Sequence, residues 1–465
     1  MNYALLVALL VAPIVAVVAT RLTEKPRVAR NVFGAATTAT AAFAILLGSR
    51  VFHAPANLVS IALVSGRGLA ISAARVPFVC LTTVVFLVVA LVADRRQLSV
   101  SGARSSAIAL LAVVIAHLAT DLAVLAIAFA LLAGVLVVDV GRARDREAQA
   151  DARLIGTILS IGVLALLVGA AATGGASVLA PLATDAHAAL DPTKVPEIAR
   201  DALVLICMVG LAVFPLHLHL PRIFAKASIG PAVALVLVQP ALVVAMHAVL
   251  PTLGSKEGTV MSVLATFSVF AAAYASLGAL GQRELRPMIG YLVSSQNGLV
   301  LAGLATRTTE GGVAAILSSM ATALTGAGLL IIAHEVESRA GHVDLRGSYG
   351  FAKPWPRLGV AYLLLSLAAL GFPGSLQFFS EDLLLQGFLA SHPFLAYAVL
   401  LVAALNGITI LRSFFVLFFG PSVLDRADYV PSDIRRRELL GPTILLSALG
   451  FLVMIGPSIG ALVER

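Results

Sequence analysis

The sequence predicts an all-α polytopic membrane protein with about fourteen transmembrane helices, in which two five-helix units repeat with inverted topology. Its composition is the first reason: 60% of the 465 residues are apolar, only 12% are charged, and the mean hydropathy is +1.00. The second reason is that apolar runs long enough to span a bilayer recur along the whole chain. The third is a regular alternation of basic and non-basic connections, which is typical of membrane topology.

The predicted spans follow one another with short connections. The first apolar run has no basic region before it and no small-residue cleavage site, so we expect a retained helix rather than a signal peptide. The twelfth is too long for one straight span and is expected to be interrupted. The spans lie near residues 2–20, 31–49, 76–93, 105–119, 121–140, 153–174, 199–217, 226–250, 259–282, 288–306, 312–335, 358–390, 393–418 and 439–461.

Lys and Arg residues concentrate in every second connection. One set of alternating connections holds 23 of the 32 basic side chains, whereas the other set, with the carboxyl end, holds 8. Because cytoplasmic loops are enriched in Lys and Arg, both termini are predicted on the outer side of the membrane, expected to be a bacterial inner membrane. The formal net charge of +8 is therefore interpreted as an orientation signal and not as a nucleic-acid surface.

Prolines predict interruptions in three spans. Pro215 lies in VFPLHLHLP at the end of the seventh span, Pro373 lies in GFPG in the twelfth, and Pro240 predicts a kink in the eighth. The seventh and twelfth spans stand five apart, an odd number, so inverted repeats would place their breaks in corresponding positions, where transport sites form. The predicted organisation is three leading helices (1–104), a first five-helix repeat (105–250), a second (259–420), and a final connection and helix (421–465).

Two consecutive acids follow the break in the twelfth span. Glu381 and Asp382 would point about 100° apart on a helix, so one can face a cavity while the other faces a neighbouring helix. A carboxylate in the membrane interior needs a partner or a proton, and Arg412 in the next span is the expected partner. Two interpretations remain open: a protonatable group in a water-accessible pocket, or an ion pair that fixes the broken helix.

Histidines mark two further places. His217 and His219 lie between Pro215 and Pro221, where they could relay protons or satisfy the broken backbone; no Cys, Asp or Glu stands close enough in sequence to favour a metal site. At the inner end of the eleventh span, His334 and Glu335 are either interfacial residues or a proton entry.

Other polar residues have simpler interpretations. Asp121 is expected to cap the fifth span, and Gln239 to bind water or a freed carbonyl beside Pro240. His117 and His247 are expected to be satisfied by neighbouring groups. Cys80 and Cys207 lie inside apolar runs and predict neither a disulfide nor a metal site. Connection 174–199 is expected to be an amphipathic surface segment, and 421–438 either a solvated loop or a subunit contact.

Four stretches carry a family pattern in order. They are QRELRPMIGYLVSSQNG (282–298), PLHLHLP (215–221), the interrupted segment with Phe378, Ser380 and Glu381, and Leu411-Arg412 followed by FFG (418–420). Together they resemble the antiporter-like membrane subunits of complex I (NADH:quinone oxidoreductase) and of Mrp-type cation/proton antiporters, with this chain as a divergent member.

The resemblance implies a subunit that works with other membrane subunits, needs no cofactor of its own and leaves electron transfer to its neighbours. It also implies ionisable groups at the centre of the fifth, seventh, eighth, eleventh and twelfth helices. The twelfth-helix position keeps its charge as Glu381. The other four positions fall on or near uncharged residues, namely Ala130, Gly210, Ala241 and Gly326.

Three functions remain open from the sequence. The first is passage of protons or monovalent cations through a half-channel at the broken twelfth helix. The second is a non-conducting structural subunit of such an assembly. The third is the membrane partner of a soluble enzyme in an inorganic-carbon uptake system. The sequence has no paired nucleophile and base and no phosphate-binding glycine loop, so no catalytic site is expected in this chain.

Overall fold

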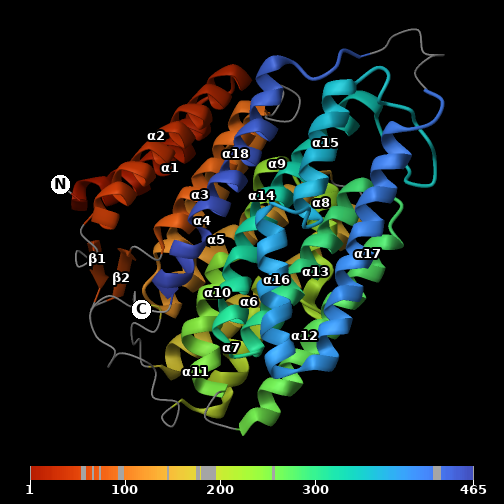
Figure 1. Ribbon diagram of the computed structural model, residues 1–465. Helices are drawn as coiled ribbons and strands as arrows, with labels where there is room; N and C mark the ends of the chain where they lie inside the picture. Colours follow the sequence, from red (N-terminus) through yellow and green to blue (C-terminus); the bar gives the residue numbers. More distant parts are fainter. Residues whose placement is uncertain are drawn as a thin grey trace.

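The computed structural model is almost entirely helical, with the long helices gathered into one bundle (Figure 1). Most of the predicted amphipathic connection at 174–199 and part of the 421–438 connection lie outside the described residues. The structure describes residues 2–53, 59–64, 67–72, 75–92, 99–143, 146–173, 179, 195–253, 257–422 and 431–463.

The first part of the chain contains three helices and a small antiparallel hairpin, which the span prediction did not include. Strand residues such as Val59 and Ile61 are β-branched, which suits extended backbone. Thr120 Oγ1 donates to the Gly68 carbonyl at 2.9 Å and so joins the hairpin to the following helices. The elements are α1 (Asn2–Leu22), α2 (Pro26–His53), β1 (Val59–Val64), β2 (Arg67–Ile71) and α3 (Val76–Val92).

The next helices form what we call the first half of the molecule. Its last two predicted spans are both interrupted, the seventh after Gly210 and the eighth after Ala234. The helices are α4 (Val100–Leu118), α5 (Leu122–Val140), α6 (Arg146–Ala172), α7 (Glu197–Gly210), α8 (His219–Lys226), α9 (Ile229–Ala234), α10 (Gln239–Val244) and α11 (Leu250–Leu253), with single turns η1 (Gly141–Ala143), η2 (Leu216–Leu218) and η3 (Ala245–Val249).

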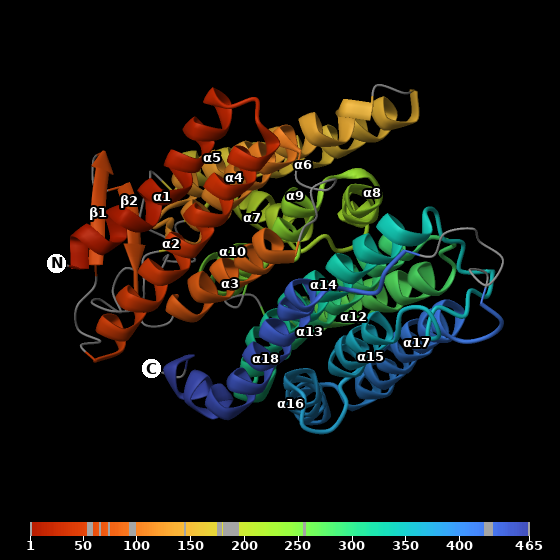
Figure 2. The ribbon, with the colours of Figure 1, turned by 90° about the horizontal axis from the view of Figure 1, so that it is seen from above.

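The remaining helices form the second half and the return to the N-terminal helices. Viewed from above, α4 to α10 lie on one side of the bundle and α12 to α17 on the other (Figure 2). The central helix α14 contacts elements of both halves, and α18 packs against α3 and α14. These helices are α12 (Glu257–Leu280), α13 (Leu285–Ala305), α14 (Thr309–Ala340), α15 (Pro356–Ala369), α16 (Leu376–Ser391), α17 (Pro393–Phe418) and α18 (Arg436–Val463).

The predicted spans agree with these helices. Among the described residues, 11 segments are long and apolar enough to cross a membrane by length and composition. The other three predicted spans are α3, which has 17 residues, and the interrupted pairs α7–α8 and α15–α16. The predicted all-α membrane fold is therefore confirmed, apart from the hairpin. The division into inverted repeats stays a prediction.

Helix starts follow the expected capping chemistry. Asp121 Oδ1 accepts hydrogen bonds from the backbone N–H groups of Ala123 and Val124, both at 3.0 Å, so its predicted role as the cap of α5 is confirmed. Ser375 caps α16 in the same way, accepting from the Phe378 N–H at 3.2 Å. This cap sets where α16 begins, and hence the depth of the acids that follow it.

Candidate functional site

The interruption between α15 and α16 is built from two glycines in left-handed backbone. Gly371 and Gly374 have φ values of +72° and +92°, which residues with a Cβ rarely adopt. The chain leaves α15 at Ala369 and re-enters a helix at Leu376, as the predicted break at Pro373 requires. Two half-helices therefore meet inside one membrane-spanning segment.

Glu381 lies in the second turn of α16 and turns inward. Gln377 Nε2 donates to Glu381 Oε1 at 2.9 Å and to Gln296 Oε1 on α13 at 3.0 Å. The other carboxylate oxygen faces the break: a Cβ on Gly371 would stand 2.7 Å from Glu381 Oε2. The carboxylate is thus enclosed between a glutamine pair and the glycine turn.

A cavity of about 30 Å³ lies behind the glutamine pair, and we call it the polar cavity because five of its twelve lining residues are polar. Asn406 on α17 donates to Ser295 Oγ on α13 at 3.0 Å. Asn406 Oδ1 and Thr322 Oγ1 are buried and have no hydrogen-bond partner within the described chain. A cavity of this volume with several polar groups can hold water. Its polar lining residues are Gln296, Thr322, Thr325, Gln377 and Asn406.

Asp382 points the opposite way from Glu381. Its side chain is on the exposed surface of the chain and accepts a hydrogen bond from Gln386 Nε2 at 2.8 Å. Phe372, Phe378 and Phe379 are also exposed there, with Phe372 56% exposed. The 100° separation predicted for the two acids therefore sends one into the protein and the other to its surface.

Arg412 does not pair with Glu381, which corrects the expected ion pair. It donates to the carbonyls of Leu280 at 2.8 Å and Gln282 at 3.1 Å, at the carboxyl end of α12, where the helix dipole favours a cation. Glu381 and Arg412 lie at different depths in the bundle, because Arg412 is farther along its helix from the α16–α17 turn at His392 than Glu381 is. At about 1.5 Å per residue, the two residues stand roughly 14 Å apart along the bundle.

The break around Pro215 is supported by the second half of the molecule. Ser294 Oγ on α13 donates to the Ala212 carbonyl at 2.6 Å, and Asn297 Nδ2 donates to the Leu211 carbonyl at 2.8 Å. Freed backbone carbonyls inside a membrane need such partners. Pro215 therefore interrupts the seventh span as predicted, with α13 supplying the missing hydrogen bonds.

The histidines beside this break have different surroundings. His219 is 1% exposed, and its Nδ1 hydrogen-bonds the Leu216 carbonyl at 2.8 Å, so it satisfies the broken backbone. His217 is equally buried but lies among aromatic rings, with centroid distances of 5.3 Å to Tyr274 and 5.7 Å to Tyr291. A proton relay through His217 stays a prediction.

Pro240 does not kink a continuous helix. The eighth span is already interrupted at 235–238, and Pro240 occupies the first turn of α10, where a missing N–H costs nothing. The neighbouring Gln239 donates to the Ser319 carbonyl at 3.0 Å, which lies within the continuous helix α14 and is not the freed carbonyl beside Pro240 that the sequence suggested.

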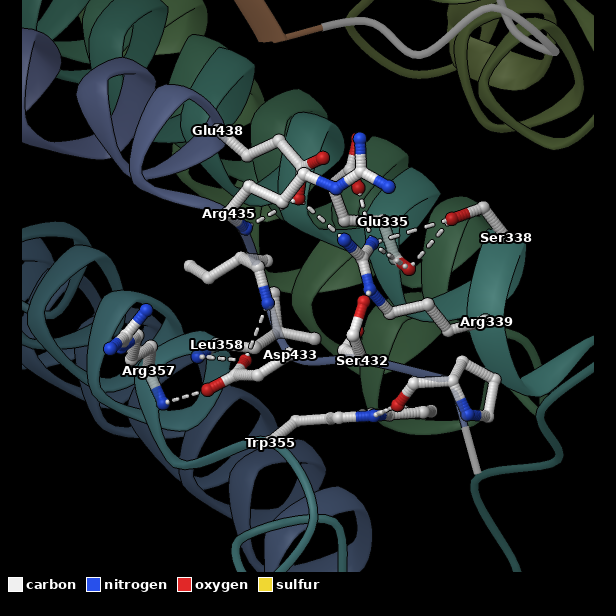
Figure 3. Close-up of polar contacts among 12 residues, drawn as sticks. Glu335, Ser338, Arg339, Trp355, Arg357, Leu358, Ser432, Asp433, Arg435 and Glu438 are labelled. Atoms are coloured by element: carbon white, nitrogen blue, oxygen red, sulfur yellow. Dashed lines mark hydrogen bonds and ion pairs between the residues drawn. The ribbon is translucent and has the colours of Figure 1, made fainter. Parts of the chain in front are cut away.

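Glu335 and His334 are held by cations at the end of α14. Arg339 forms ion pairs with Glu335, which is 3% exposed, and with Glu438 at 2.6 Å (Figure 3). His334 accepts from Arg286 Nη1 at 3.3 Å and donates to the Leu330 carbonyl at 2.9 Å. Arg339 thus fixes α14 against α18, Glu335 holds its guanidinium from within α14, and the predicted role of Glu335 in proton entry stays a prediction.

The same cluster fastens the 431–435 segment to α15 (Figure 3). Asp433 caps α15 by accepting from the backbone N–H groups of Arg357 at 2.8 Å and Leu358 at 3.3 Å. Trp355 Nε1 donates to the Pro431 carbonyl at 2.8 Å. The described part of the predicted 421–438 connection is therefore folded onto the bundle by its own side chains.

The first half has a different interior beside its own interrupted spans. An apolar cavity of about 60 Å³ lies there, lined by both Gly210 and Ala241. A Cβ on Gly210 would come 2.6 Å from the Ala241 Cβ, and one on Gly326 would come 2.9 Å from Val236. Ala130 faces the exposed side of α5. Of the four uncharged positions, Gly210 and Ala241 thus face each other and Ala130 is turned away. Gly326 packs against Val236 and lines the polar cavity of the second half.

Sequence reasoning missed the glutamine pair and Asn406. Gln377 stands one helical turn before Glu381, so i, i+4 spacing could have found it. Gln296 and Asn406 are amides inside apolar spans, a rare placement that marks functional or structural polar contacts. Their meeting across α13, α16 and α17 was not visible in the sequence.

Interrupted spans that enclose a carboxylate beside a polar cavity define a membrane protein of the transporter-related class. A comparison of the sequence with protein families then identifies the family within this class. The chain belongs to the NADH:quinone oxidoreductase/Mrp antiporter transmembrane family, whose model matches residues 119–407.

Known proteins support this assignment. NADH-quinone oxidoreductase subunit N of Desulforudis audaxviator is 28% identical over 289 residues, which cover 59% of this chain and 55% of that protein. The chain spans about half the length of the curated relatives it matches.

Solved structures share the fold. A chain of respiratory complex I from Thermus thermophilus matches with a TM-score of 0.79 and 19% identity, covering 98% of this chain and 99% of that one. A chain of the Mrp complex from Dietzia sp. DQ12-45-1b gives a TM-score of 0.82 and 18% identity, covering 100% and 96%.

Proposed function

We propose that this chain is a membrane subunit of a complex I-like or Mrp-like assembly and that its second half carries a half-channel for protons or monovalent cations. The observation that carries the proposal is the half-buried Glu381 carboxylate, held by Gln377 between the glycine break and a polar cavity. An ionisable residue enclosed within a membrane-spanning segment is expected to serve an ion pathway. The basic connections support an orientation with both termini outside, in a membrane that we propose to be a bacterial inner membrane.

The residues suggest how access to the carboxylate is controlled. Gln377 and Gln296 stand between the cavity and Glu381. The side-chain amide of Gln377 donates both to Gln296 Oε1 and to Glu381 Oε1. In the proposed half-channel, water in the cavity exchanges a proton with Glu381 when this amide turns away. The glycine turn at Gly371 leaves space on the other side for the carboxylate oxygen.

The surface around the break supports a neighbouring subunit. Asp382 is charged and exposed, and Phe372 and Pro373 of the non-helical turn are exposed beside it. Non-helical backbone and charged groups at membrane depth are stable only where protein or a water-filled cavity covers them. In the proposed assembly, another membrane subunit covers this face of α16.

The test is proton flux in proteoliposomes that contain the intact assembly. Glu381→Gln keeps the size and hydrogen bonding of the side chain but removes its titratable proton, so flux should be abolished. The matched control is Asp382→Asn, the same change on the neighbouring residue, with flux retained. Normal flux in Glu381→Gln, with the assembly intact, would contradict the proposal.

A non-conducting structural subunit is the second candidate. It is favoured by the first half, where Gly210 and Ala241 touch across an apolar cavity and no described side chain in the lining can carry a proton. Under this alternative both acid variants leave flux unchanged. The same experiment therefore separates the two functions.

A further inference from the structure

A large groove lies on the surface of α3, away from the polar cavity. It has a volume of about 600 Å³ and lies between α2 and α18, and α14 forms its base. Among its lining residues the one hydroxyl, of Ser49, donates to the Leu46 carbonyl of its own helix at 2.9 Å. The lining is otherwise apolar or a thiol: Ile45, Gly48, Val76, Pro77, Cys80, Leu81, Val84, Leu324, Ala448, Phe451, Leu452 and Ile455.

We propose that this groove holds one acyl chain of a membrane phospholipid, with the lipid phosphate at Arg50. The length of the groove supports an acyl chain. Along α3 it extends from Val76 to Val84, or about 12 Å at 1.5 Å per residue. One leaflet of a bilayer is about 15 Å thick in its hydrocarbon part, half of the whole core. The groove therefore follows one leaflet from its boundary inward.

Charge supports a phospholipid. Arg50 follows the groove residue Ser49 in the last turn of α2 and is half-buried. It forms no ion pair within the described chain. The groove begins at the same depth, where Gly48 meets Val76. An anionic phosphate at the boundary would complement this guanidinium while its acyl chain fills the groove.

The dimensions argue against a helix of another subunit as the occupant. A helix about 10 Å wide occupies roughly 900 Å³ over this length, so only one side of a helix could sit in a groove of about 600 Å³. A single extended hydrocarbon chain is much thinner. Since lipid and groove are equally apolar, selectivity must come from close packing and from the phosphate contact.

The base of the groove provides a specific reporter. Leu324 on α14 is 1% exposed, and bulk lipid outside the bundle reaches it only through the groove. The experiment uses the intact assembly in native-lipid membranes with phosphatidylglycerol that carries a diazirine at the end of one acyl chain. After irradiation, mass spectrometry should find the probe on α14 near Leu324 and on α3 near Val84.

Paired variants test the assignment. Ala448→Phe fills the groove from α18 and should reduce labelling of α14 severalfold. Ser447→Phe adds the same ring at the adjacent exposed position and should leave it unchanged. Arg50→Gln should reduce labelling by phosphatidylglycerol but not by a diacylglycerol probe, whereas Arg21→Gln, at the other end of the N-terminal helix pair, should change neither.

Three results would overturn the proposal. One is wild-type protein without label on α14. Another is equal labelling of the wild type and Ala448→Phe. The third is a copurified isoprenoid quinone, or a helix of another subunit, crosslinked in the groove. None of these results depends on ion flux, so this inference can fail while the proposed half-channel stands.

Discussion

In the first half of the molecule, the interrupted α7–α8 segment lies beside a cavity of about 60 Å³ lined entirely by apolar residues, glycine and proline. In the second half, the cavity near the α15–α16 break is smaller, about 30 Å³, yet amides and hydroxyls line it and Glu381 adjoins it. Both halves contain a break, but only one break has a described acid beside it. Under the proposed function, a broken helix provides the place for an ion pathway, and the polar side chains beside it distinguish the second half from the first.

The two breaks also differ in which groups bind or cover their non-helical backbone. The α7–α8 break is satisfied from within the chain, because Ser294 and Asn297 bind its carbonyls. The α15–α16 break leaves Phe372 and Pro373 on the surface. The first break is thus completed by folding, whereas the second leaves exposed residues that the proposed neighbouring subunit would cover.

The largest expected effect on stability concerns the close approach of Gly210 and Ala241 in the first half. Gly210→Ala brings two Cβ atoms within 2.6 Å and should destabilise the protein by about 1–3 kcal/mol through overpacking. Thermal unfolding of the purified assembly measures this loss. Adding Ala241→Gly removes the opposing methyl group and should restore most of the stability. Failure of this rescue would show that the two positions do not limit the packing of the first half.

The next prediction compares two glycines of the second break. Gly371→Ala and Gly374→Ala both place a Cβ at positive φ, which costs about 1–2 kcal/mol. Only the Gly371 methyl group meets Glu381 Oε2, at 2.7 Å, whereas nothing lies within 4 Å of a Cβ at Gly374. Both variants should lose similar stability, but Gly371→Ala alone should also lose ion flux. Equal ion flux in the two variants would contradict a role of the Gly371 turn in the ion pathway.

The smallest expected effects come from replacing one buried glutamine in each half of the molecule. Gln377→Leu leaves Glu381 without its donor and should lower flux about tenfold, equivalent to about 1.4 kcal/mol. Gln239→Leu removes the hydrogen bond to the Ser319 carbonyl and should cost about 1 kcal/mol of stability with flux unchanged. Flux assays and melting of the same preparations check both. A flux defect in Gln239→Leu would mean that the first half also conducts.

The sequence by itself determined the spans, their expected orientation and the breaks at Pro215 and Pro373, but not the interruption at 235–238. This is because span length, loop charge and proline act locally, through bilayer thickness, topology and the missing backbone donor. The same local chemistry gave the Asp121 cap and identified Glu381 as the acid that follows a break.

Tertiary structure decided which groups meet. Arg412 lies in the expected helix but about 14 Å away in depth, so it binds carbonyls and not Glu381. Glu381 accepts instead from Gln377 on its own helix, and the same Gln377 amide donates to Gln296, 85 residues before Glu381 in the chain. Hydropathy fixes where a helix crosses the membrane, but its rotation and height relative to its neighbours follow from packing, which no local pattern encodes.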